Sequence, residues 1–449
     1  MVVDFSLEIW RAHQDSQAII WRDKAYTYGW LLERFLYWKE TLADQELKPG
    51  SVVVLEADFS PNAVALFFAL MDRRCILVPL TDSVKAKRDE FITTAQGEVS
   101  FSIDAQDAVS INPLPNVATH PFYLRLRAAG HPGLVLFSSG STGESKAAVH
   151  DLTTLLEKFK VRRQTLRTIT FLLYDHIGGV NTLLYTMSNA GCIITLQSRD
   201  PDEVLAAVEK HRAELLPTSP TFLNLVLLSE AYKRHDLSSL KTITYGTEPM
   251  PEHTLKRFQE LFPGINLQQT YGLSEVGILR SKSRDSGSLW VKVGGEGFET
   301  RIVDGILHIK ARSAMFGYLN APSPFTEDGW FNTGDAVEVD GEYVKILGRK
   351  SEIINVGGEK VYPAEVENVI QELDAVSEVT VYGERNPITG SIVCADITPV
   401  SVLDEAQRKE FIALVKRHCR QKLRSYQVPL KVNITSESQH TERFKKARR

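Results

Sequence analysis

The sequence predicts an α/β fold with a large N-terminal domain, built on doubly wound, mainly parallel sheets, and a small α+β C-terminal domain. Its 449 residues suffice for two to four domains at about 100–200 residues per domain. Short apolar runs alternate with helical patterns through the first part of the chain, as a parallel sheet requires. The last hundred residues instead combine two helical patterns with three strand patterns. These observations define the fold class.

The elements follow in order along the chain. Residues 18–27 resemble a hairpin and residues 30–42 an amphipathic helix, and the apolar helix pattern at 62–71 lies between two strand patterns. Residues 216–222 form a turn that leads into a further apolar helix. Further strands are expected at 51–55, 75–80, 134–137, 168–174, 192–196, 242–245 and 267–270, and a helix at 181–187. In the C-terminal part we expect helices at 363–373 and 404–423, strands at 378–382 and 391–396, and a last strand after residue 429.

Composition excludes several function classes. The chain is 43% hydrophobic and 24% charged with a formal net charge of −4, so it lacks the basic excess of a nucleic-acid-binding domain. No apolar run approaches the roughly 18 residues of a membrane span, and the N-terminus has no secretory pattern. The four cysteines lack metal-ligand spacing, and three lie in apolar surroundings typical of core thiols. We therefore expect a reducing, cytoplasmic compartment. The cysteines are Cys75, Cys192, Cys394 and Cys419.

A loop rich in hydroxyls and glycines follows the strand at 134–137. Glycine allows backbone N–H groups to approach one anion closely, and a lysine adds a charge-assisted donor, so the loop suits a phosphate. It is not the usual P-loop, because two residues separate its second glycine from the lysine and Ala147 stands where a metal-binding hydroxyl belongs. A flexible surface turn is the alternative interpretation. The loop residues are Ser138, Ser139, Gly140, Ser141, Thr142, Gly143 and Lys146.

The pattern Ser-Ser-Gly-Ser-Thr-Gly-x-x-Lys at 138–146 resembles the signature loop of the adenylate-forming superfamily. That superfamily includes acyl-CoA synthetases, peptide-synthetase adenylation domains and beetle luciferases. The resemblance covers about residues 50–449. It implies that His176, in Asp-His-Ile-Gly-Gly at 175–179, lies beside the acyl pocket and the carboxylate being activated. A histidine that satisfies local turn hydrogen bonds is the alternative.

The segment 271–275, Tyr-Gly-Leu-Ser-Glu, combines complementary groups after a strand. Tyr271 could stack on adenine, Ser274 could contact a phosphate, and Glu275 could hold Mg²⁺, which prefers carboxylate and phosphate oxygens. With Gly272, this matches the superfamily motif Tyr-Gly-x-Thr/Ser-Glu about 130 residues after the loop. A plain strand-end turn is the alternative. The resemblance also implies one wall of the adenine site at Gly246, Thr247, Glu248 and Pro249.

Further positions follow from the resemblance. Asp335 is implied to hold both ribose hydroxyls, for which a carboxylate that accepts two hydrogen bonds is suited. Arg349 reaches the ribose or phosphate, and Gly-Tyr-Leu-Asn at 317–320 is mainly structural. A mobile C-terminal domain begins at residue 349, so we expect domains at 1–348 and 349–449. Ser351 occupies the hinge position, and Gly357 and Gly358 line a tunnel for the thiol.

The C-terminal tail departs from the superfamily pattern Thr-x-x-Gly-Lys. Counting from Thr441 places Phe444 at the glycine and Lys445 at the catalytic lysine, while a slip of one residue selects Lys446. The alternative is a frayed basic tail, since chain ends are commonly disordered.

The resemblance implies that a small-molecule carboxylic acid attacks the α-phosphorus of Mg²⁺-bound ATP, giving acyl-AMP and pyrophosphate, followed by transfer to CoA. Lys445, His176 and Glu275 form the catalytic set. Transfer to the phosphopantetheine of an acyl carrier protein is a close alternative, and a luciferase-like oxidation is a weaker one. A catalytically weak nucleotide-binding paralogue is the alternative of another class, because Phe444 replaces glycine. The acid could be an aryl or a medium-to-long fatty acid. The sequence does not define the oligomeric state.

Overall fold

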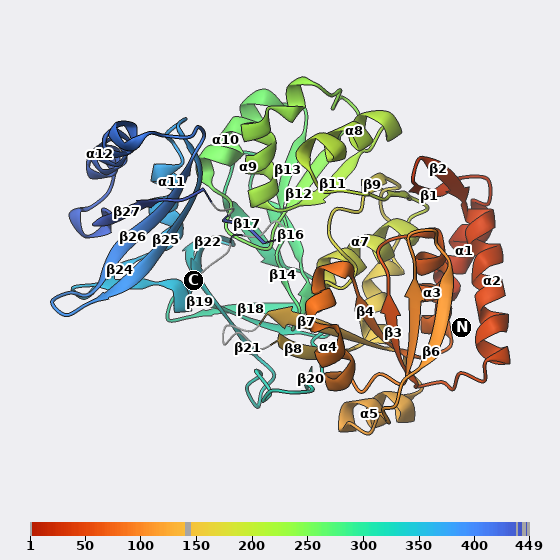
Figure 1. The fold of residues 1–449 in the computed structure, drawn as a ribbon. Coiled ribbons are helices and arrows are strands. Elements are labelled where there is room, and N and C mark those ends of the chain that lie inside the picture. Colours follow the sequence, from red (N-terminus) through yellow and green to blue (C-terminus); the bar gives the residue numbers. More distant parts are fainter. Residues whose placement is uncertain (1, 140–144, 437–438, 442–445, 447–449) are drawn as a thin grey trace.

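The structure is a computed structural model of the chain, and it describes residues 2–139, 145–436, 439–441 and 446. Two seven-stranded sheets with their helices form one side of the molecule, a six-stranded sheet lies beside them, and a five-stranded sheet lies at the opposite end (Figure 1). This matches the predicted fold class. The six-stranded sheet is antiparallel and was not predicted.

One seven-stranded sheet contains the strand that leads to the phosphate loop. Its order is β20-β8-β7-β4-β3-β5-β6, and the pairs from β7 to β5 are parallel, whereas β6, β8 and β20 pair in antiparallel fashion at its margins. Residues 52–55 are fully buried, as expected for a strand covered on both faces. The strands are β3 (Val52–Glu56), β4 (Ile76–Leu80), β5 (Val99–Ile103), β6 (Val109–Pro113), β7 (Gly133–Ser139), β8 (Ser145–Asp151) and β20 (Gly317–Tyr318).

The second seven-stranded sheet has the order β13-β12-β11-β9-β10-β1-β2 and is parallel except for the predicted β1–β2 hairpin. The strand expected at 168–174 is shorter, since pairing with β10 stops at Ile169. Residues 216–218, the first part of the turn expected at 216–222, instead belong to β11, a buried strand paired with β12. The strands are β1 (Gln17–Trp21), β2 (Lys24–Thr27), β9 (Arg167–Ile169), β10 (Cys192–Ile194), β11 (Leu215–Thr218), β12 (Thr242–Tyr245) and β13 (Asn266–Gln269).

Several helices begin at a Ser or Asp N-cap followed by Pro, a pairing that satisfies an orphan N–H and fixes φ for the first turn. Ser60 accepts from Ala63 N at 3.1 Å and Ser219 from Phe222 N at 3.2 Å. The largest buried cluster combines side chains of both seven-stranded sheets with α3 and α7, so these helices lie in the main core. The helices are α1 (Asp4–Ala12), α2 (Tyr28–Asp44), α3 (Pro61–Asp72), α4 (Arg88–Thr94), α5 (Pro121–Ala129), α6 (Leu152–Leu156), α7 (Ile177–Met187), α8 (Pro201–His211), α9 (Pro220–Ser229) and α10 (Glu252–Leu261), with 3₁₀ turns at 82–87, 157–159 and 231–233.

The antiparallel sheet has the order β16-β17-β22-β21-β19-β18. A two-stranded ribbon, β14–β15, follows the second parallel sheet. The bounds are β14 (Gly272–Leu273), β15 (Gly277–Ile278), β16 (Arg280–Ser283), β17 (Trp290–Gly294), β18 (Phe298–Val303), β19 (Ile306–Ala311), β21 (Phe331–Asp340) and β22 (Tyr343–Arg349).

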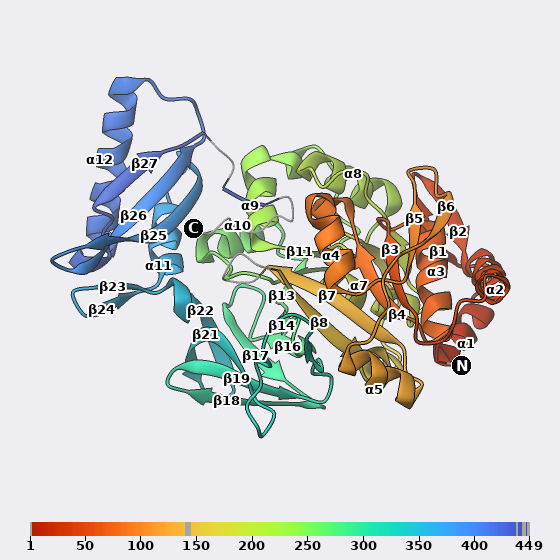
Figure 2. The ribbon, with the colours of Figure 1, turned by 60° about the horizontal axis from the view of Figure 1, so that its bottom comes forward.

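The C-terminal part has its own core, between one face of the five-stranded sheet and two helices. The order is β24-β23-β26-β25, with β27 beside β26, and a capping box at Asp404 and Gln407 begins α12. Figures 1 and 2 place β24 at the outer end of this sheet, away from β7 and β8. A domain boundary at residue 349 remains a proposal. The elements are the 3₁₀ turn Lys350–Glu352, β23 (Ile354–Val356), β24 (Glu359–Val361), α11 (Pro363–Ile370), β25 (Val376–Asn386), β26 (Gly390–Pro399), α12 (Glu405–Lys422), the 3₁₀ turn Ser425–Gln427 and β27 (Lys431–Ile434).

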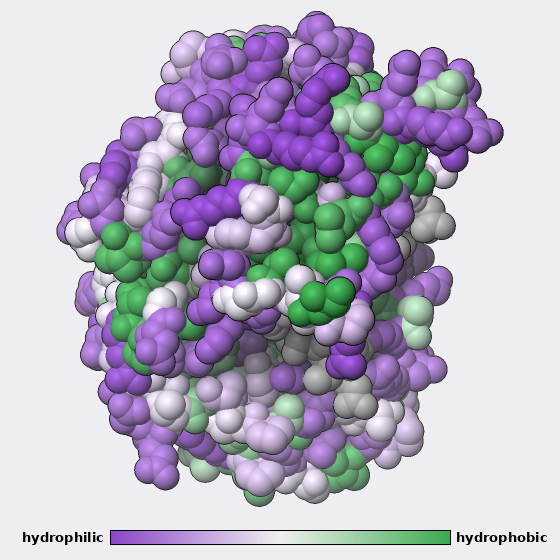
Figure 3. Space-filling model, turned by 90° about the vertical axis from the view of Figure 1, so that its left-hand side faces the viewer, coloured by the Kyte–Doolittle hydropathy of each residue, from purple (hydrophilic) through white to green (hydrophobic). Residues whose placement is uncertain are grey.

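The face formed mainly by the C-terminal part is predominantly hydrophilic, with hydrophobic side chains gathered in a band across its middle (Figure 3). All four cysteines are buried free thiols. Within the described residues, no helix is both long and apolar enough to cross a membrane.

The first turn of α7 is packed too closely for any side chain at Gly179. A Cβ there would lie 1.9 Å from the carbonyl oxygen of Leu173. We expect Gly179→Ala to lower the free energy of unfolding by about 1–3 kcal/mol, because the backbone must shift to admit the methyl group. Urea unfolding measures this. Gly264→Ala is the control, since a Cβ at Gly264 meets nothing within 4 Å; equal stability of the two variants would contradict the prediction.

Candidate active site

The residues that flank the expected phosphate loop belong to β7 and β8. Ser138 pairs with Lys146 and Ser139 with Ser145, so both ends of the loop are fixed by the sheet. The Ser145 hydroxyl accepts from Lys87 Nζ at 3.2 Å. Four residues expected to contact phosphate lie outside the described residues: Gly140, Ser141, Thr142 and Gly143.

Asn320 fixes the strand that carries Lys146. Its Oδ1 accepts from the Ala147 N–H at 3.0 Å, and its Nδ2 donates to the Ser145 carbonyl at 2.8 Å. This amide therefore adds two side-chain bonds to a strand that already pairs with β20. The segment 317–320, expected to be mainly structural, holds the start of β8 directly beside the loop.

Tyr318 connects Lys146 with Glu275. Its hydroxyl donates to Glu275 Oε1 at 2.5 Å, and the Lys146 ammonium lies 5.4 Å from the centre of its ring. Burial and the neighbouring carboxylate raise the pKa of Tyr318, so the phenol keeps its proton and remains a donor. The sequence suggested no role for this tyrosine, although it stands in a motif that the sequence did mark.

A second contact chain joins Tyr271, Asp335 and Arg349. The Tyr271 hydroxyl donates to Asp335 Oδ2 at 2.5 Å, and Arg349 Nε lies 3.4 Å from Asp335 Oδ1. Burial raises the pKa of Asp335, while the hydrogen bond from Tyr271 and the charge of Arg349 oppose that rise. Tyr271 is buried, with its hydroxyl directed to the carboxylate expected to bind ribose.

Electrostatic interactions join these two sets of side-chain contacts into one cluster. The charge of Glu275 contributes to the raised pKa of Asp335, and that of Arg349 counteracts the raised pKa of Tyr318. Strands and loops from four separate parts of the sequence thus bring two carboxylates and two cations together. This arrangement offers oxygen ligands for a divalent cation, acceptors for paired hydroxyls and positive charge for phosphate. The cluster residues are Lys146, Tyr271, Glu275, Tyr318, Asp335 and Arg349.

The expected adenine wall lies against the end of β13. A Cβ at Gly246 would be 2.6 Å from Thr270 Oγ1, so only glycine fits between these strand ends. Thr247 has φ of 76°, an uncommon backbone conformation for a residue with a side chain. The wall therefore lies directly beside Tyr271, which follows Thr270. Pro249, also expected in the wall, lines a pocket that Gln439 and Lys446 of the tail line as well.

Glu248 contacts other parts of the chain. Its Oε1 accepts from the N–H and hydroxyl of Thr221, at 2.8 and 2.5 Å, and its Oε2 accepts from the Lys446 N–H at 2.9 Å. Its carboxylate is thus already engaged by protein donors. Contact of this side chain with nucleotide remains a prediction.

His176 is the N-cap residue of α7, where its carbonyl accepts from Val180 N at 3.0 Å. Its side chain does not cap the helix. The preceding Asp175 is buried and accepts from the Thr81 hydroxyl at 2.8 Å. His176 thus occupies the junction of the β9 segment and α7, partly exposed.

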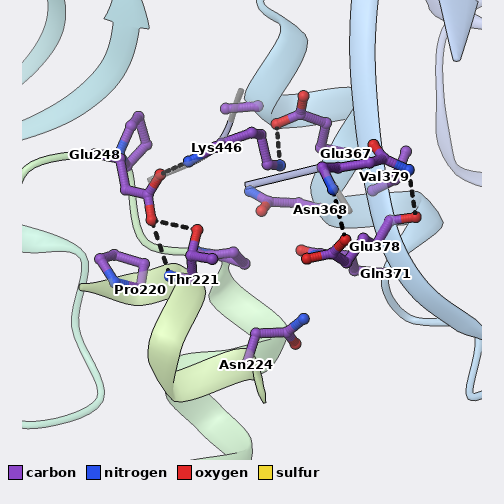
Figure 4. Close-up of a pocket in the computed structure, with 14 residues that line it drawn as sticks. Pro220, Thr221, Asn224, Glu248, Glu367, Asn368, Gln371, Glu378, Val379 and Lys446 are labelled. Atoms are coloured by element: carbon purple, nitrogen blue, oxygen red, sulfur yellow. Dashed lines mark hydrogen bonds and ion pairs between the residues drawn. The ribbon is translucent and has the colours of Figure 1, made fainter. Parts of the chain in front are cut away.

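The described tail residue Lys446 lies between the two parts of the chain (Figure 4). Its ammonium is 2.8 Å from Glu367 Oε2 in α11, while its N–H binds Glu248. His440 pairs with Lys446 as an antiparallel bridge and contacts Glu378 Oε1 at 2.6 Å. Lys445, the expected catalytic lysine, lies outside the described residues.

The remaining predicted positions are in the C-terminal part. Ser351 is exposed in the 3₁₀ turn after β22. Gly357 and Gly358 form the turn between β23 and β24 with φ of 61° and 94°, and a Cβ on either would meet nothing within 4 Å. Figures 1 and 2 place this hairpin away from β7 and β8, the strands that flank the expected phosphate loop.

Comparison with known proteins agrees with these motifs. The family model of AMP-binding enzymes matches residues 8–304, and that of the AMP-binding enzyme C-terminal domain matches residues 365–445. The match begins at residue 8, well before residue 50, where the resemblance in the sequence begins. An indoleacetate–CoA ligase of Aromatoleum aromaticum is 30% identical over 60% of this chain and 58% of that protein. A long-chain-fatty-acid–CoA ligase, FadD13, of Mycobacterium tuberculosis is 25% identical over 83% and 82%.

Solved structures show the same fold. The crystal structure of the anthranilate CoA ligase AuaEII with anthranoyl-AMP superposes with a TM-score of 0.83 and 20% identity, covering 99% of this chain and 95% of that one. The chain spans less than two thirds of the length of the indoleacetate–CoA ligase.

The anchoring of the tail should depend on pH through His440. Its hydrogen bond to Glu378 raises the pKa of His440. Because the folded-state pKa lies above the unfolded one, the stabilisation is complete below the ordinary histidine pKa of about 6.5 and is lost as the pH rises through the raised value.

We expect limited proteolysis at the tail to be slower at pH 6 than at pH 8.5. His440→Gln removes the titrating group and should flatten this difference, after correction for the pH dependence of the protease on an unstructured peptide. A wild-type difference that survives in the variant would assign the effect to other groups.

Proposed function

The chain belongs to the family of AMP-binding enzymes, and on that premise we propose that it is an acid–thiol ligase. It would use ATP to convert a carboxylic acid to acyl-AMP with release of pyrophosphate, and then transfer the acyl group to the thiol of CoA. The observation that best supports this is the cluster around Tyr318 and Asp335, which gathers the Tyr-Gly-x-Ser-Glu segment, the loop lysine and the expected ribose carboxylate.

In the first step an oxygen of the substrate carboxylate attacks the α-phosphorus of ATP. The bond to the bridging oxygen breaks, and that oxygen leaves with pyrophosphate. Such reactions depend on positioning and on electrostatic stabilisation of phosphoryl charge. We assign the leaving phosphates to residues 138–146, with Ser274 at the phosphate, and the nucleoside to Tyr271, Asp335 and Arg349. His176 would lie at the substrate carboxylate.

Glu275 fits a role in binding Mg²⁺. It supplies a carboxylate beside the strand that carries Lys146, and the hydrogen bond from Tyr318 restricts its orientation. Bound Mg²⁺ would neutralise phosphate charge. Tyr318 would then position the metal ligand.

Lys445 is our assignment for the cation that the tail contributes to adenylation. The neighbouring Lys446 already binds Glu367, which supports this register. The weak-paralogue hypothesis would gain support if the tail were dispensable.

The second step requires the C-terminal part to move. The thiol sulfur would attack the acyl carbon, the bond to the AMP oxygen would break, and the thiol proton would pass to solvent. We propose rotation at Ser351 that brings the Gly357–Gly358 turn to the adenylate, because that turn now lies at the outer end of its sheet. Domain motions of this kind commonly gate catalysis. A carrier-protein thiol could use the same route.

Removal of the Tyr318 hydroxyl should weaken use of the metal. Tyr318→Phe loses a hydrogen bond to a charged group, valued at about 1.5–3 kcal/mol. We expect acid-dependent ATP–pyrophosphate exchange to fall about tenfold or more and to require higher Mg²⁺. Exchange assayed across a magnesium series measures both, and Tyr343→Phe serves as a control outside the cluster. An unchanged magnesium profile would contradict the assigned role.

The central experiment is ATP–pyrophosphate exchange with a panel of aryl, short-chain and long-chain acids, without CoA. Exchange with at least one acid is expected, and its absence with all acids, while ATP still binds, would favour the paralogue hypothesis. Addition of CoA or a phosphopantetheinylated carrier then identifies the acceptor from the thioester formed.

Substitution of the two tail lysines tests the register. Lys445→Ala should reduce exchange by at least about a hundredfold while sparing thioester formation from supplied acyl-adenylate, since electrostatic groups of this kind contribute about 3–4 kcal/mol. Lys446→Ala should mainly release the tail, detected by proteolysis. The opposite pattern would move the catalytic position to Lys446.

A further inference from the structure

Lys158 carries a charge for which the described residues supply no carboxylate partner. The residue lies in the 3₁₀ turn Glu157–Phe159 after α6, and its ammonium is largely enclosed, donating to Asn181 Oδ1 at 2.6 Å and to the Ile278 carbonyl at 3.1 Å. Both acceptors are neutral. In the described part of the chain no carboxylate forms an ion pair with it. An enclosed charge is costly unless it is paired, so this lysine calls for an explanation.

Its surroundings add positive charge. Burial, together with the charges of Arg163 and Arg280, lowers the pKa of Lys158 to about 8. The amine therefore remains mainly protonated at neutral pH. Two exposed arginines on two other segments thus act on the same ammonium, which also lies 5.0 Å from the centre of the Phe159 ring. An ammonium has three donors, one more than its two neutral acceptors use.

The position of Lys158 relates it to the proposed acid site. Asn181 lies on α7 five residues beyond His176, about 7 Å along the helix axis at 1.5 Å per residue. Ile278 lies on β15, three residues beyond Glu275. The two segments that hold the ammonium therefore both lead back to the groups assigned to the activated carboxylate and the metal.

Resting on the proposed function, we propose that Lys158 recognises a second anionic group on the substrate, apart from the carboxylate that His176 would contact. The substrate would be a dicarboxylic acid whose second carboxylate reaches the Lys158 ammonium while the first lies beside His176. One oxygen would accept the free N–H of Lys158. Lys158 would act in specificity and take no part in bond making.

A purely structural role of Lys158 predicts a different experimental result. The two hydrogen bonds to Asn181 and Ile278 join α7 to β15, and their loss would lower stability for every substrate alike. Recognition of an anion instead changes the preference between matched acids.

The test compares straight-chain dicarboxylates of four to eight carbons with monocarboxylates of equal length in ATP–pyrophosphate exchange. The wild type should prefer at least one dicarboxylate by tenfold or more in kcat/KM, mainly through KM. Lys158→Met should abolish or reverse this preference, and Lys158→Arg should retain part of it. Lys160→Met is the matched control, because Lys160, two residues after Lys158, is exposed and paired with Glu157.

Exchange with monocarboxylates but no preference for any dicarboxylate would overturn the inference and leave the proposed function intact. Equal losses for all acids in a folded Lys158→Met protein would assign a structural role instead.

No exchange with any acid would overturn the proposed function. The dicarboxylate series would then be measured by the shift in thermal unfolding, where a stabilisation present in wild type and lost in Lys158→Met supports the site and its absence rejects it. If Lys158→Met does not fold, the wild-type preference alone decides the inference.

Discussion

The buried carboxylate of Asp335 is the constraint on which the arrangement of the site depends. Desolvation disfavours its charge, so its oxygens need donors, and these come from Tyr271 and Arg349. Tyr271 follows the last strand of a parallel sheet, whereas the other two belong to adjacent strands of the antiparallel sheet. One polar contact therefore fixes the relative position of two sheets. Because Arg349 is also the last residue of β22, it links the same carboxylate to the segment where we propose that the C-terminal part moves.

Much of the parallel architecture could be predicted because its strands are almost continuously apolar. Residues 52–55 and 76–78 are fully buried, and such runs are recognisable without partners. The antiparallel sheet was missed for the converse reason: β18 is largely exposed and alternates little, so no apolar run identifies it. Tyr318 and Lys158 escaped notice because their roles arise from contacts with residues 43 and 120 positions away, which no local spacing encodes.

The motifs of the site were predictable from residue type and order along the chain. They combine residue types whose chemistry is evident and whose order along the chain identifies the family, as the match to AMP-binding enzymes confirms. Their mutual contacts were not predictable. Glu248 was expected at the nucleotide, yet its carboxylate accepts from Thr221 and from the tail. The wall segment and the tail are thus physically connected, so a change in the position of the tail alters the hydrogen bonding of the residue next to Thr247.

A second contact of the tail, the ion pair between Lys446 and Glu367, bears on which tail lysine can take part in catalysis. Glu367 is almost completely buried, and its carboxylate accepts from the Lys446 ammonium and from the Val381 N–H. Withdrawing Lys446 would leave a buried carboxylate without its counter-charge, a loss of about 3–5 kcal/mol for such pairs. A catalytic cation must instead direct its donors at the charge that develops in the transition state, whereas the Lys446 ammonium is bound to Glu367. In this arrangement the energetic argument therefore favours Lys445 for catalysis and gives Lys446 the task of holding the tail between α11 and the wall.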